Sequence, residues 1–351
     1  RYYLPHLQGW LKTLLLGTGA TATASAAGLA VWYRSLTSGE PLPPSHWARQ
    51  PIRQIAGRSL DNDLQLTLFQ YQTCPFCCKV RAYLDYSGLG YNIVEVNSVS
   101  RQQIRWMNDY RKVPVLYAAP ANSSASGDEV VLKDSSVIMS ALESRIRDPS
   151  QSLAQLRLCY PGIVGEEGGK LTYPNRYFVM QPGQKLDESK LREEQKWRQW
   201  VDDVFVHTIS PNIYRTLPEA LDSFRWFDKA GDWEKCFTPA ERALVIYTGA
   251  AVMRLVSMRL RSKYNLHRDV RKSLYNELDA FLLNGVGKRR FRGGDRPDLS
   301  DLSMYGVLTA MEGTAAFSDA MDNCPKLRPW FGRMRAAVSA REGGGRLAGA
   351  A

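Results

Sequence analysis

Cysteine and histidine are scarce in this sequence. Its 351 residues include six cysteines and four histidines, and only Cys74, Cys77 and Cys78 lie close together. No second Cys-x-x-Cys and no nearby Cys-x-x-His accompanies this group. A secreted disulfide framework and a structural zinc site are therefore poor interpretations, and we expect no metal. The pattern fits a compartment that keeps thiols reduced.

Recognisable nucleic-acid-binding motifs are also missing, although the net charge is +11. The sequence has no zinc finger, RNA-recognition signature or array of basic helices, so we expect no nucleic acid partner. Anionic lipid or an acidic protein surface is a better match for the positive charge. The basic stretches at 254–263 and 288–292 are most simply interpreted as solvated surface.

Charged residues are absent from 14–33. About 20 uncharged residues are enough to cross a bilayer, and the many small residues here favour packing against another membrane helix. Acidic residues are absent before Glu40, which is typical of a mitochondrial targeting segment. We predict a membrane anchor, with a helix at about 11–33, in a protein of the mitochondrial inner membrane; the Golgi or another endomembrane is the alternative. Prolines over 40–55 predict a stiff linker without regular helix, which completes an N-terminal region over 1–60.

The chain does have a Cys-Pro-Phe-Cys motif, at a predicted strand-to-helix junction. Apolar residues over 64–71 predict a buried strand, and apolar residues at helical spacing over 77–86 predict a helix. The first turn of a helix has unpaired N–H groups and the positive end of the helix dipole, which together stabilise a thiolate. Cys74 is therefore the expected nucleophile, with a lowered pKa. Cys77, one turn later, either resolves a mixed disulfide on Cys74 or is a small buried residue.

Alternating strands and helices are predicted after the motif. Their order is a strand at 91–96, a helix at 98–110, a strand at 113–117 and an edge strand at 129–132. Pro114 stands where the third strand begins, and Asp134 or Ser135 is the expected N-cap of the next helix. The first two strands and their helix form a parallel β-α-β unit. The sequence thus predicts an α/β domain over 61–147.

The C-terminal half is predicted to be helical. A connecting segment over 148–190, with one short hairpin, leads into a helical domain over 191–341 and a tail over 342–351 that we expect to be mobile. The predicted helices are 191–210, ending at Pro211, then 241–264, 268–283, one beginning at Asp298, and 325–341. The second of these is so apolar that we expect it at the centre of the bundle. Asp298 and Asp301 predict a capping box.

The motif and its surroundings resemble the thioredoxin fold in its glutaredoxin and glutathione-transferase branch. The resemblance rests on Cys-Pro-Phe-Cys after a strand, Val-Pro before the third strand and Asp-Ser-Ser-Val-Ile at a helix start. More narrowly, LTLFQYQTCPFCCKVRAYLDY resembles the membrane-associated prostaglandin E synthases of type 2, strongly over 61–146 and more loosely over the helical half. This resemblance implies an α/β plus all-α fold. The first part is a thioredoxin-like domain of the glutaredoxin or glutathione-transferase N-terminal type, and the second is a transferase-like helical bundle.

The resemblance also implies a glutathione site. In such a site the backbone at the Val113–Pro114 strand start pairs with the cysteinyl part of glutathione, like an added strand. Asp134 and Ser135 hold the γ-glutamyl group at a helix N-terminus, where an anion is favoured, and an ordinary N-cap is compatible with this role. The walls of the thiol pocket are assigned to two aromatic residues, Tyr71 and Phe76.

The function that the resemblance implies is isomerisation of the lipid endoperoxide prostaglandin H2 to prostaglandin E2. Cys74, or the thiol of bound glutathione, attacks the endoperoxide. Haem near Cys74 is a second implied cofactor, and a homodimer is the implied oligomer. Two alternatives stay open: a glutaredoxin-like thiol–disulfide oxidoreductase, and a non-catalytic accessory subunit of a larger mitochondrial membrane complex. Cys77 separates the two enzymes, because a dithiol cycle requires it and isomerisation does not.

Overall fold

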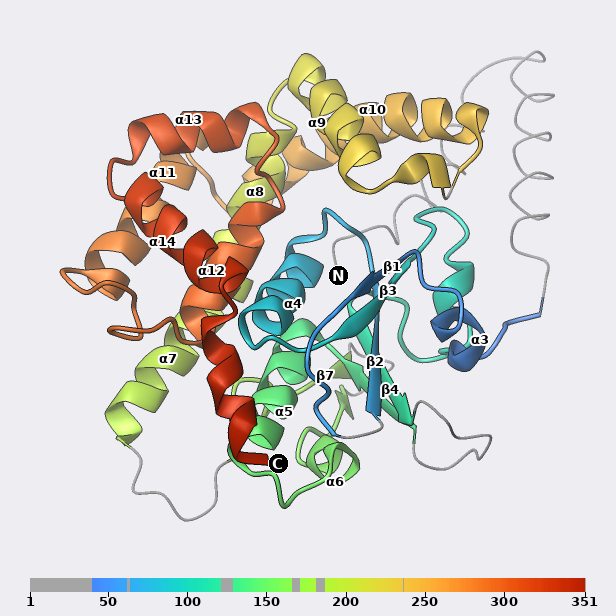
Figure 1. The fold of residues 1–351 in the computed structure, drawn as a ribbon. Helices are drawn as coiled ribbons and strands as arrows, with labels where there is room; N and C mark the ends of the chain where they lie inside the picture. Colours follow the sequence, from blue (N-terminus) through green and yellow to red (C-terminus); the bar gives the residue numbers. More distant parts are fainter. Residues whose placement is uncertain are drawn as a thin grey trace. The chain divides into compact units, whose positions relative to one another are not determined.

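The computed structural model describes residues 40–61, 64–120, 129–165, 171–180, 187–235 and 237–350 (Figure 1). The chain divides into two units. Within the described residues, the smaller unit contains 40–50 and 96–112, and the larger contains 51–95 and 113–350. The membrane helix that we expected at about 11–33 lies outside the described residues.

The smaller unit contains two short helices, α3 (Pro44–Ala48) and the 3-10 helix η1 (Gln102–Ile104). The expectation that 40–55 lacks regular helix is therefore wrong. Pro44 is the first residue of α3, where the missing N–H of proline has no hydrogen bond to lose.

The helix expected over 98–110 is also reduced, to the single turn of η1. The Asn97 side chain accepts hydrogen bonds from the N–H groups of Val99 (2.9 Å) and Ser100 (2.8 Å). This local turn competes with a helix start at the same positions.

A five-stranded sheet, in the order β1-β3-β2-β4-β5, forms the α/β part of the larger unit (Figure 1). Its strands are β1 (Arg53–Ile55), β2 (Leu64–Gln70), β3 (Tyr91–Glu95), β4 (Val115–Pro120) and β5 (Val130–Lys133). β3 is parallel to β2, whereas β4 is antiparallel to β2 and β5 is antiparallel to β4. α4 (Pro75–Tyr86) connects the parallel pair, α5 (Ser135–Arg147) follows β5, and both helices cover one face of the sheet. This arrangement confirms the thioredoxin-like fold.

Helices form the rest of the larger unit. They are α6 (Leu153–Leu158), α7 (Glu188–Trp200), α8 (Val206–Ile213), α9 (Leu217–Ala230), α10 (Pro239–Lys263), α11 (Val270–Ala280), α12 (Leu299–Thr309), α13 (Ala315–Asn323) and α14 (Leu327–Ser339). The shorter elements are the hairpin β6 (Ile163–Val164) and β7 (Leu171–Thr172), the π-helical stretches η2 (Val201–Phe205) and η4 (Phe281–Val286), and the 3-10 helices η3 (Trp233–Lys235) and η5 (Glu342–Ala350). A helical region after the α/β part is therefore confirmed.

Several helix boundaries differ from those expected. α8 runs through Pro211 to Ile213, because the burial of Ile209 and Ile213 in the core offsets the hydrogen bond that proline removes. α9 and α13 were not predicted. For α9 a signal was present, since Thr216 accepts a hydrogen bond from the N–H of Glu219 as an N-cap.

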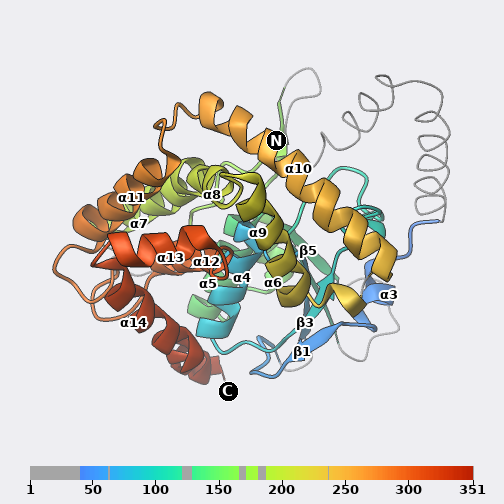
Figure 2. The same ribbon diagram turned by 90° about the horizontal axis from the view of Figure 1, so that it is seen from above.

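α10 is not the central helix of the bundle. It packs against α9 and α8, and little of its surface is buried (Figure 2). Tyr247 is 60% exposed and Met258 is 53% exposed. Among the described residues, α10 is the one helix that is long and apolar enough to cross a membrane, by length and composition alone.

The tail that we expected to be mobile forms η5. Arg346 of this segment makes an ion pair with the buried Glu143 of α5 (2.5 Å). Glu143 also accepts a hydrogen bond from Arg147 (2.8 Å). The charge pairing explains why a Gly- and Ala-rich segment packs against the α/β part.

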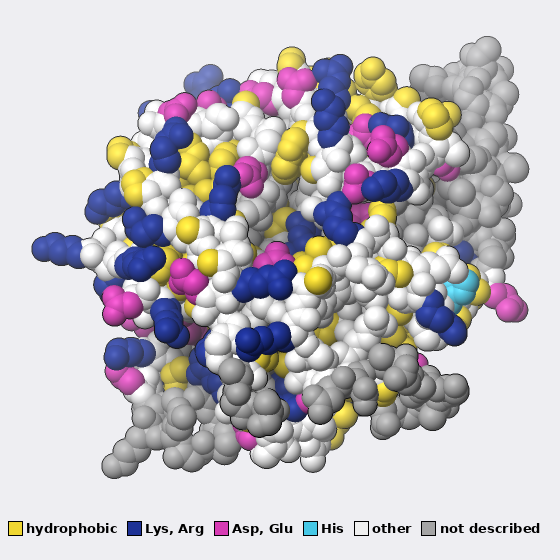
Figure 3. Space-filling model, in the orientation of Figure 1, with side chains coloured by type: hydrophobic (Ala, Val, Ile, Leu, Met, Phe, Trp, Pro, Cys, Tyr) yellow, Lys and Arg dark blue, Asp and Glu magenta, His cyan; other side chains and the backbone are white. Residues whose placement is uncertain are grey.

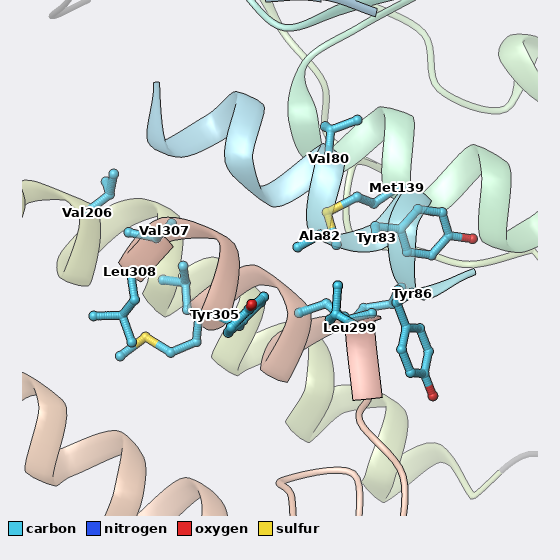
Figure 4. Packing of buried hydrophobic residues seen from close by; sticks show 14 of the residues in the cluster. Val80, Ala82, Tyr83, Tyr86, Met139, Val206, Leu299, Tyr305, Val307 and Leu308 are labelled. Atoms are coloured by element: carbon cyan, nitrogen blue, oxygen red, sulfur yellow. The ribbon is translucent and has the colours of Figure 1, made fainter. Parts of the chain in front are cut away.

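α4 packs closely against α12 of the helical part. A Cβ atom on Gly306 would lie 2.5 Å from the Cα of Lys79 and 2.7 Å from the carbonyl oxygen of Cys78. Only glycine allows the two helices to approach this closely. Figure 4 shows Met139 of α5 and Leu299 of α12 beside the same stretch of α4. The helix that carries the Cys-Pro-Phe-Cys motif is thus packed against both α5 and α12.

Candidate active site

Cys74 lies at the N-terminus of α4, as the sequence predicts. It is the N-cap residue, and its carbonyl oxygen accepts the first helical hydrogen bond, from the N–H of Cys78 (2.9 Å). Pro75 is the first residue of the helix. Cys74 is half-buried, whereas Cys77 is fully buried (0% exposed).

The two thiols have opposite pKa shifts. A hydrogen bond between the Cys74 and Cys77 side chains lowers the pKa of Cys74, and the N–H groups at the helix start and the Arg81 guanidinium lower it further. Burial raises the pKa of Cys77 well above its usual range, as does the neighbouring Cys74. The geometry therefore favours a thiolate on Cys74 and a retained proton on Cys77.

Two charged residues behind the motif, the half-buried Arg81 and the buried Glu95, were missed by sequence reasoning. Arg81 donates hydrogen bonds to the carbonyl oxygen of Gln72 (2.6 Å) and to the sulfur of Cys78 (3.0 Å). The Glu95 carboxylate accepts one from the N–H of Gln72 (2.7 Å), and burial raises the pKa of Glu95 to about 7. Together they hold the turn between β2 and α4. The only sequence signal was a single acidic residue in the apolar strand YNIVEV.

The residues predicted to bind glutathione come from three places in the sequence, and the sheet brings them to one end. In the strand register, Phe69 pairs with Val115, and Val115 pairs with Lys133. The chain segments that follow β2, precede β4 and follow β5 therefore lie side by side. These segments contain all the predicted site residues: Tyr71, Cys74, Phe76 and Cys77 after β2, Val113 and Pro114 before β4, and Asp134 and Ser135 after β5.

β4 begins at Val115, two residues after Val113. The backbone N–H and C=O groups of Val113 are therefore outside the ladder of β4. The peptide bond between Val113 and Pro114 is cis. Backbone groups beside the end of a strand suit pairing with an extended peptide such as glutathione.

Asp134, rather than Ser135, is the N-cap of α5. Its side chain accepts hydrogen bonds from the N–H groups of Ser136 (2.9 Å) and Val137 (3.3 Å). The second carboxylate oxygen lies 3.7 Å from the guanidinium of Arg176. Ser135 is only 4% exposed. A helix N-terminus, a carboxylate and a cation thus meet where the sequence predicts recognition of an amino-acid end.

A buried ion pair joins α4 to the helical part just behind the motif. The Lys79 ammonium lies 2.5 Å from a carboxylate oxygen of Asp202, in η2, and also donates to the Ser136 hydroxyl (3.0 Å). The Tyr177 hydroxyl donates to the same carboxylate (3.1 Å). Burial opposes ionisation, yet the Lys79 ammonium lowers the pKa of Asp202 overall. Neither charge was identified from the sequence, because its partner is distant along the chain.

Phe76 and Tyr71 flank the thiols. Phe76 is half-buried against the hydrophobic core, and its ring centroid is 5.8 Å from the Lys79 ammonium. Tyr71 is half-buried too, and its carbonyl oxygen accepts a hydrogen bond from the Cys74 N–H (3.1 Å). Within the described residues, no group of His, Cys, Asp or Glu side chains could hold a metal ion.

Known proteins are similar to this chain in sequence, and a known domain family matches part of it. The family model for the glutathione S-transferase N-terminal domain matches residues 68–150. Prostaglandin E synthase 2 of Danio rerio is 44% identical over 288 residues, which are 80% of this chain and 72% of the relative. Prostaglandin E synthase 2 of Mus musculus is 41% identical over 338 residues, which are 92% of this chain and 82% of the relative.

This chain belongs to the prostaglandin E synthase 2 family. Among solved structures, the beta-etherase LigF from Sphingobium sp. strain SYK-6 is 19% identical, with a TM-score of 0.44, and the match covers 79% of this chain and 98% of the etherase. The Cys-Pro-Phe-Cys motif at 74–77 lies inside the region that the transferase domain model matches.

Proposed function

We propose that this protein is a glutathione-dependent prostaglandin E synthase that isomerises prostaglandin H2 to prostaglandin E2 at Cys74. The observation that carries the proposal is the pair of thiols at the start of α4. Cys74 is accessible and its pKa is lowered, while the buried Cys77 keeps its proton. The two relatives named prostaglandin E synthase 2 support the substrate.

The proposed reaction uses the thiolate as a nucleophile that is regenerated. The Cys74 thiolate attacks one oxygen of the endoperoxide, so that a sulfur–oxygen bond forms and the oxygen–oxygen bond breaks. The released oxygen takes a proton and becomes the hydroxyl group. Loss of a proton from the carbon that bears the sulfur-linked oxygen then forms the ketone, breaks the sulfur–oxygen bond and restores the thiolate. Atoms and electrons balance, since product and substrate are isomers.

Glutathione supplies a second thiol to the site when bound. The Val113 backbone would pair with its peptide groups, and Asp134 with Ser135 at the start of α5 would hold its γ-glutamyl end. Tyr71 and Phe76 would line the space beside Cys74. Glutathione is the cofactor that the proposal includes, because the family model that matches residues 68–150 is that of a glutathione S-transferase domain.

The test is formation of prostaglandin E2 from prostaglandin H2 by the purified full chain with glutathione. We expect Cys74→Ser to lose nearly all of the isomerisation above the uncatalysed rate, because the hydroxyl does not ionise near neutral pH. Cys159→Ser is the matched control, since Cys159 is a half-buried free cysteine outside the site. Full activity of Cys74→Ser would refute the proposal.

The hydrogen-bonded thiol pair also favours a second candidate, a dithiol oxidoreductase. Cys77→Ser distinguishes the two. A dithiol cycle stops without the resolving thiol, whereas isomerisation continues, because a hydroxyl at this position still donates a hydrogen bond to Cys74. Reduction of a disulfide within a substrate protein, which leaves a mixed disulfide on Cys74 that Cys77 must resolve, and isomerisation are therefore both measured on the same variant.

A further inference from the structure

A concave site lies in the helical part, outside the candidate active site. It is a cavity of about 580 Å³ between the segment that follows η4 and the start of α14. Five cationic side chains line it: Lys288, Arg289, Arg290, Lys326 and Arg333. None of the described residues around it is acidic. Lys and Arg side chains gather on the left of Figure 3, the side on which Figure 1 draws α11 and α14.

These five charges lack acidic partners within the part of the chain that the structure describes. Their neighbours differ in this respect: Arg292 pairs with Asp298, and Arg328 pairs with Asp322. Lys288, Arg290 and Lys326 are exposed. Like charges gathered around one cavity raise the local potential, and an anion in the cavity lowers it.

Two of the arginines are held in place by the backbone. The Arg289 guanidinium donates hydrogen bonds to the carbonyl oxygens of Gly285 and Val286 at the end of η4. Arg333 donates to the carbonyl oxygen of Arg290 (3.1 Å). Each contact uses only some of the five N–H groups of a guanidinium, so the remaining donors are available to a ligand. A fixed guanidinium fork matches the oxygens of a phosphate.

The floor of the cavity is apolar. Leu282 and Val286 of η4 and Trp330 of α14 contribute to it. α14 begins beside the cavity with Lys326 as its N-cap residue, without a side-chain cap and without an acidic residue in its first turn. Its helix dipole therefore adds to the positive potential of the five side chains. The size suits a small molecule, or a lipid headgroup with part of its apolar chain.

We propose that this cavity binds an anion that carries two or more phosphate charges. Five cations around one cavity exceed what a single carboxylate neutralises, and the apolar floor accepts a carbon skeleton attached to the phosphates. The ligand is either a soluble diphosphate or the headgroup of an anionic phospholipid, because both present the same oxygens. None of the lining residues belongs to the candidate active site, so the proposal does not depend on the function of Cys74.

The test compares two triple variants of the full chain. Lys288→Gln/Arg290→Gln/Lys326→Gln removes three exposed charges at the cavity. Arg157→Gln/Arg261→Gln/Arg268→Gln removes three exposed charges elsewhere and leaves the same net charge. Circular dichroism first establishes that both variants are folded. Titration calorimetry with inorganic pyrophosphate at low and at physiological salt then gives the affinity for the soluble probe.

We expect saturable binding to the wild-type chain, weaker at higher salt. The cavity variant should bind about tenfold more weakly or worse, because three charge-assisted hydrogen bonds are lost, and the control variant should stay within about twofold. Equal losses in both variants would mean that net charge alone attracts the probe, and the proposal would be wrong.

Vesicles separate the two sources of phosphate. Co-sedimentation of the same three proteins is measured with phosphatidylcholine vesicles, with and without a lipid that carries two phosphates. Binding to pyrophosphate and not to vesicles assigns a soluble ligand, whereas binding to charged vesicles that the cavity variant loses and the control retains assigns a lipid headgroup. No cavity-dependent binding in either assay would overturn the proposal.

Discussion

The buried Glu95 side chain positions the segment that leads to the motif. It holds the N–H of Gln72 and the side-chain amide of Gln70 (3.2 Å), and so fixes the residues that lead from β2 to Cys74. Burial raises its pKa from 4.5 to about 7. The carboxyl group is therefore more easily ionised in the unfolded chain than in the folded protein.

This shift predicts a pH dependence of stability. Below about pH 4.5 the group is protonated in both states and has no effect. As the pH rises to about 7, the unfolded state loses its proton first, so the free energy of unfolding falls by as much as about 3 kcal/mol and then levels off. Glu95→Gln keeps an acceptor and does not titrate. In urea unfolding, we expect the variant to gain stability over wild type between pH 5 and pH 8.

Glu188→Gln is the matched control for this experiment. The Glu188 side chain is exposed on α7, so the difference from wild type should stay nearly constant with pH. If the Glu95→Gln difference were also constant, the raised pKa of Glu95 would be wrong.

At the scale of elements, the contact between α4 and α12 depends on one residue without a side chain. We expect Gly306→Ala to force the helices apart, because its Cβ would lie 2.5 Å from the backbone of Lys79. The free energy of unfolding in urea should fall by about 1 to 3 kcal/mol. Gly332→Ala in α14 is the control, since nothing lies within 4 Å of the added Cβ, and it should be stabilising by about 0.5 to 1 kcal/mol. Equal effects of the two changes would exclude a special role for this contact.

Local chemistry explains which elements could be predicted. Pro75 after a strand and Asp134 before an apolar run are signals within a few residues, and both mark true helix starts. The helix expected over 98–110 failed because the side chain of Asn97 offered the backbone a competing turn. α10 was placed at the centre because an apolar composition does not say which of its faces is covered.

The candidate site was predictable where its residues lie in local sequence patterns, and not where they depend on a distant partner. Cys74 comes from a recognisable local pattern, whereas Val113 and Asp134 were assigned to glutathione by the family resemblance. The sheet register brings the segments of all three to one end. Lys79 and Asp202 were not predictable, because each is an ordinary charged residue in a helix until the other is placed beside it. The cavity residues gave a basic run in the sequence, but only the fold adds Lys326 and Arg333 to it.

At the scale of the whole molecule, the ion pair of Lys79 and Asp202 is a buried polar link between the α/β part and the helical part. Its side chains are 0% and 6% exposed. Removing one partner leaves an uncompensated buried charge, so we expect Lys79→Met to lower the free energy of unfolding by about 3 to 5 kcal/mol. The double variant Lys79→Met/Asp202→Leu should recover much of this loss, because no buried charge is left.

Urea unfolding of wild type, both single variants and the double variant gives the coupling energy. Lys190→Met is the control, because its pair with Asp187 is exposed and should contribute less than about 1 kcal/mol. Additive effects of the two buried substitutions would show that Lys79 and Asp202 act independently, contrary to the structure.

The same ion pair limits how this architecture can be recombined. Lys79 belongs to the segment that carries the thiols, and Asp202 belongs to a π-helical turn more than a hundred positions later in the chain. A chimera takes position 79 from the parent of its thiol-bearing half and position 202 from the parent of its helical half. If only one parent has the Lys79–Asp202 pair, the chimera contains one buried charge without its partner. The halves are therefore not interchangeable modules. A homologue with uncharged residues at both positions can replace the two halves together, but not one half alone.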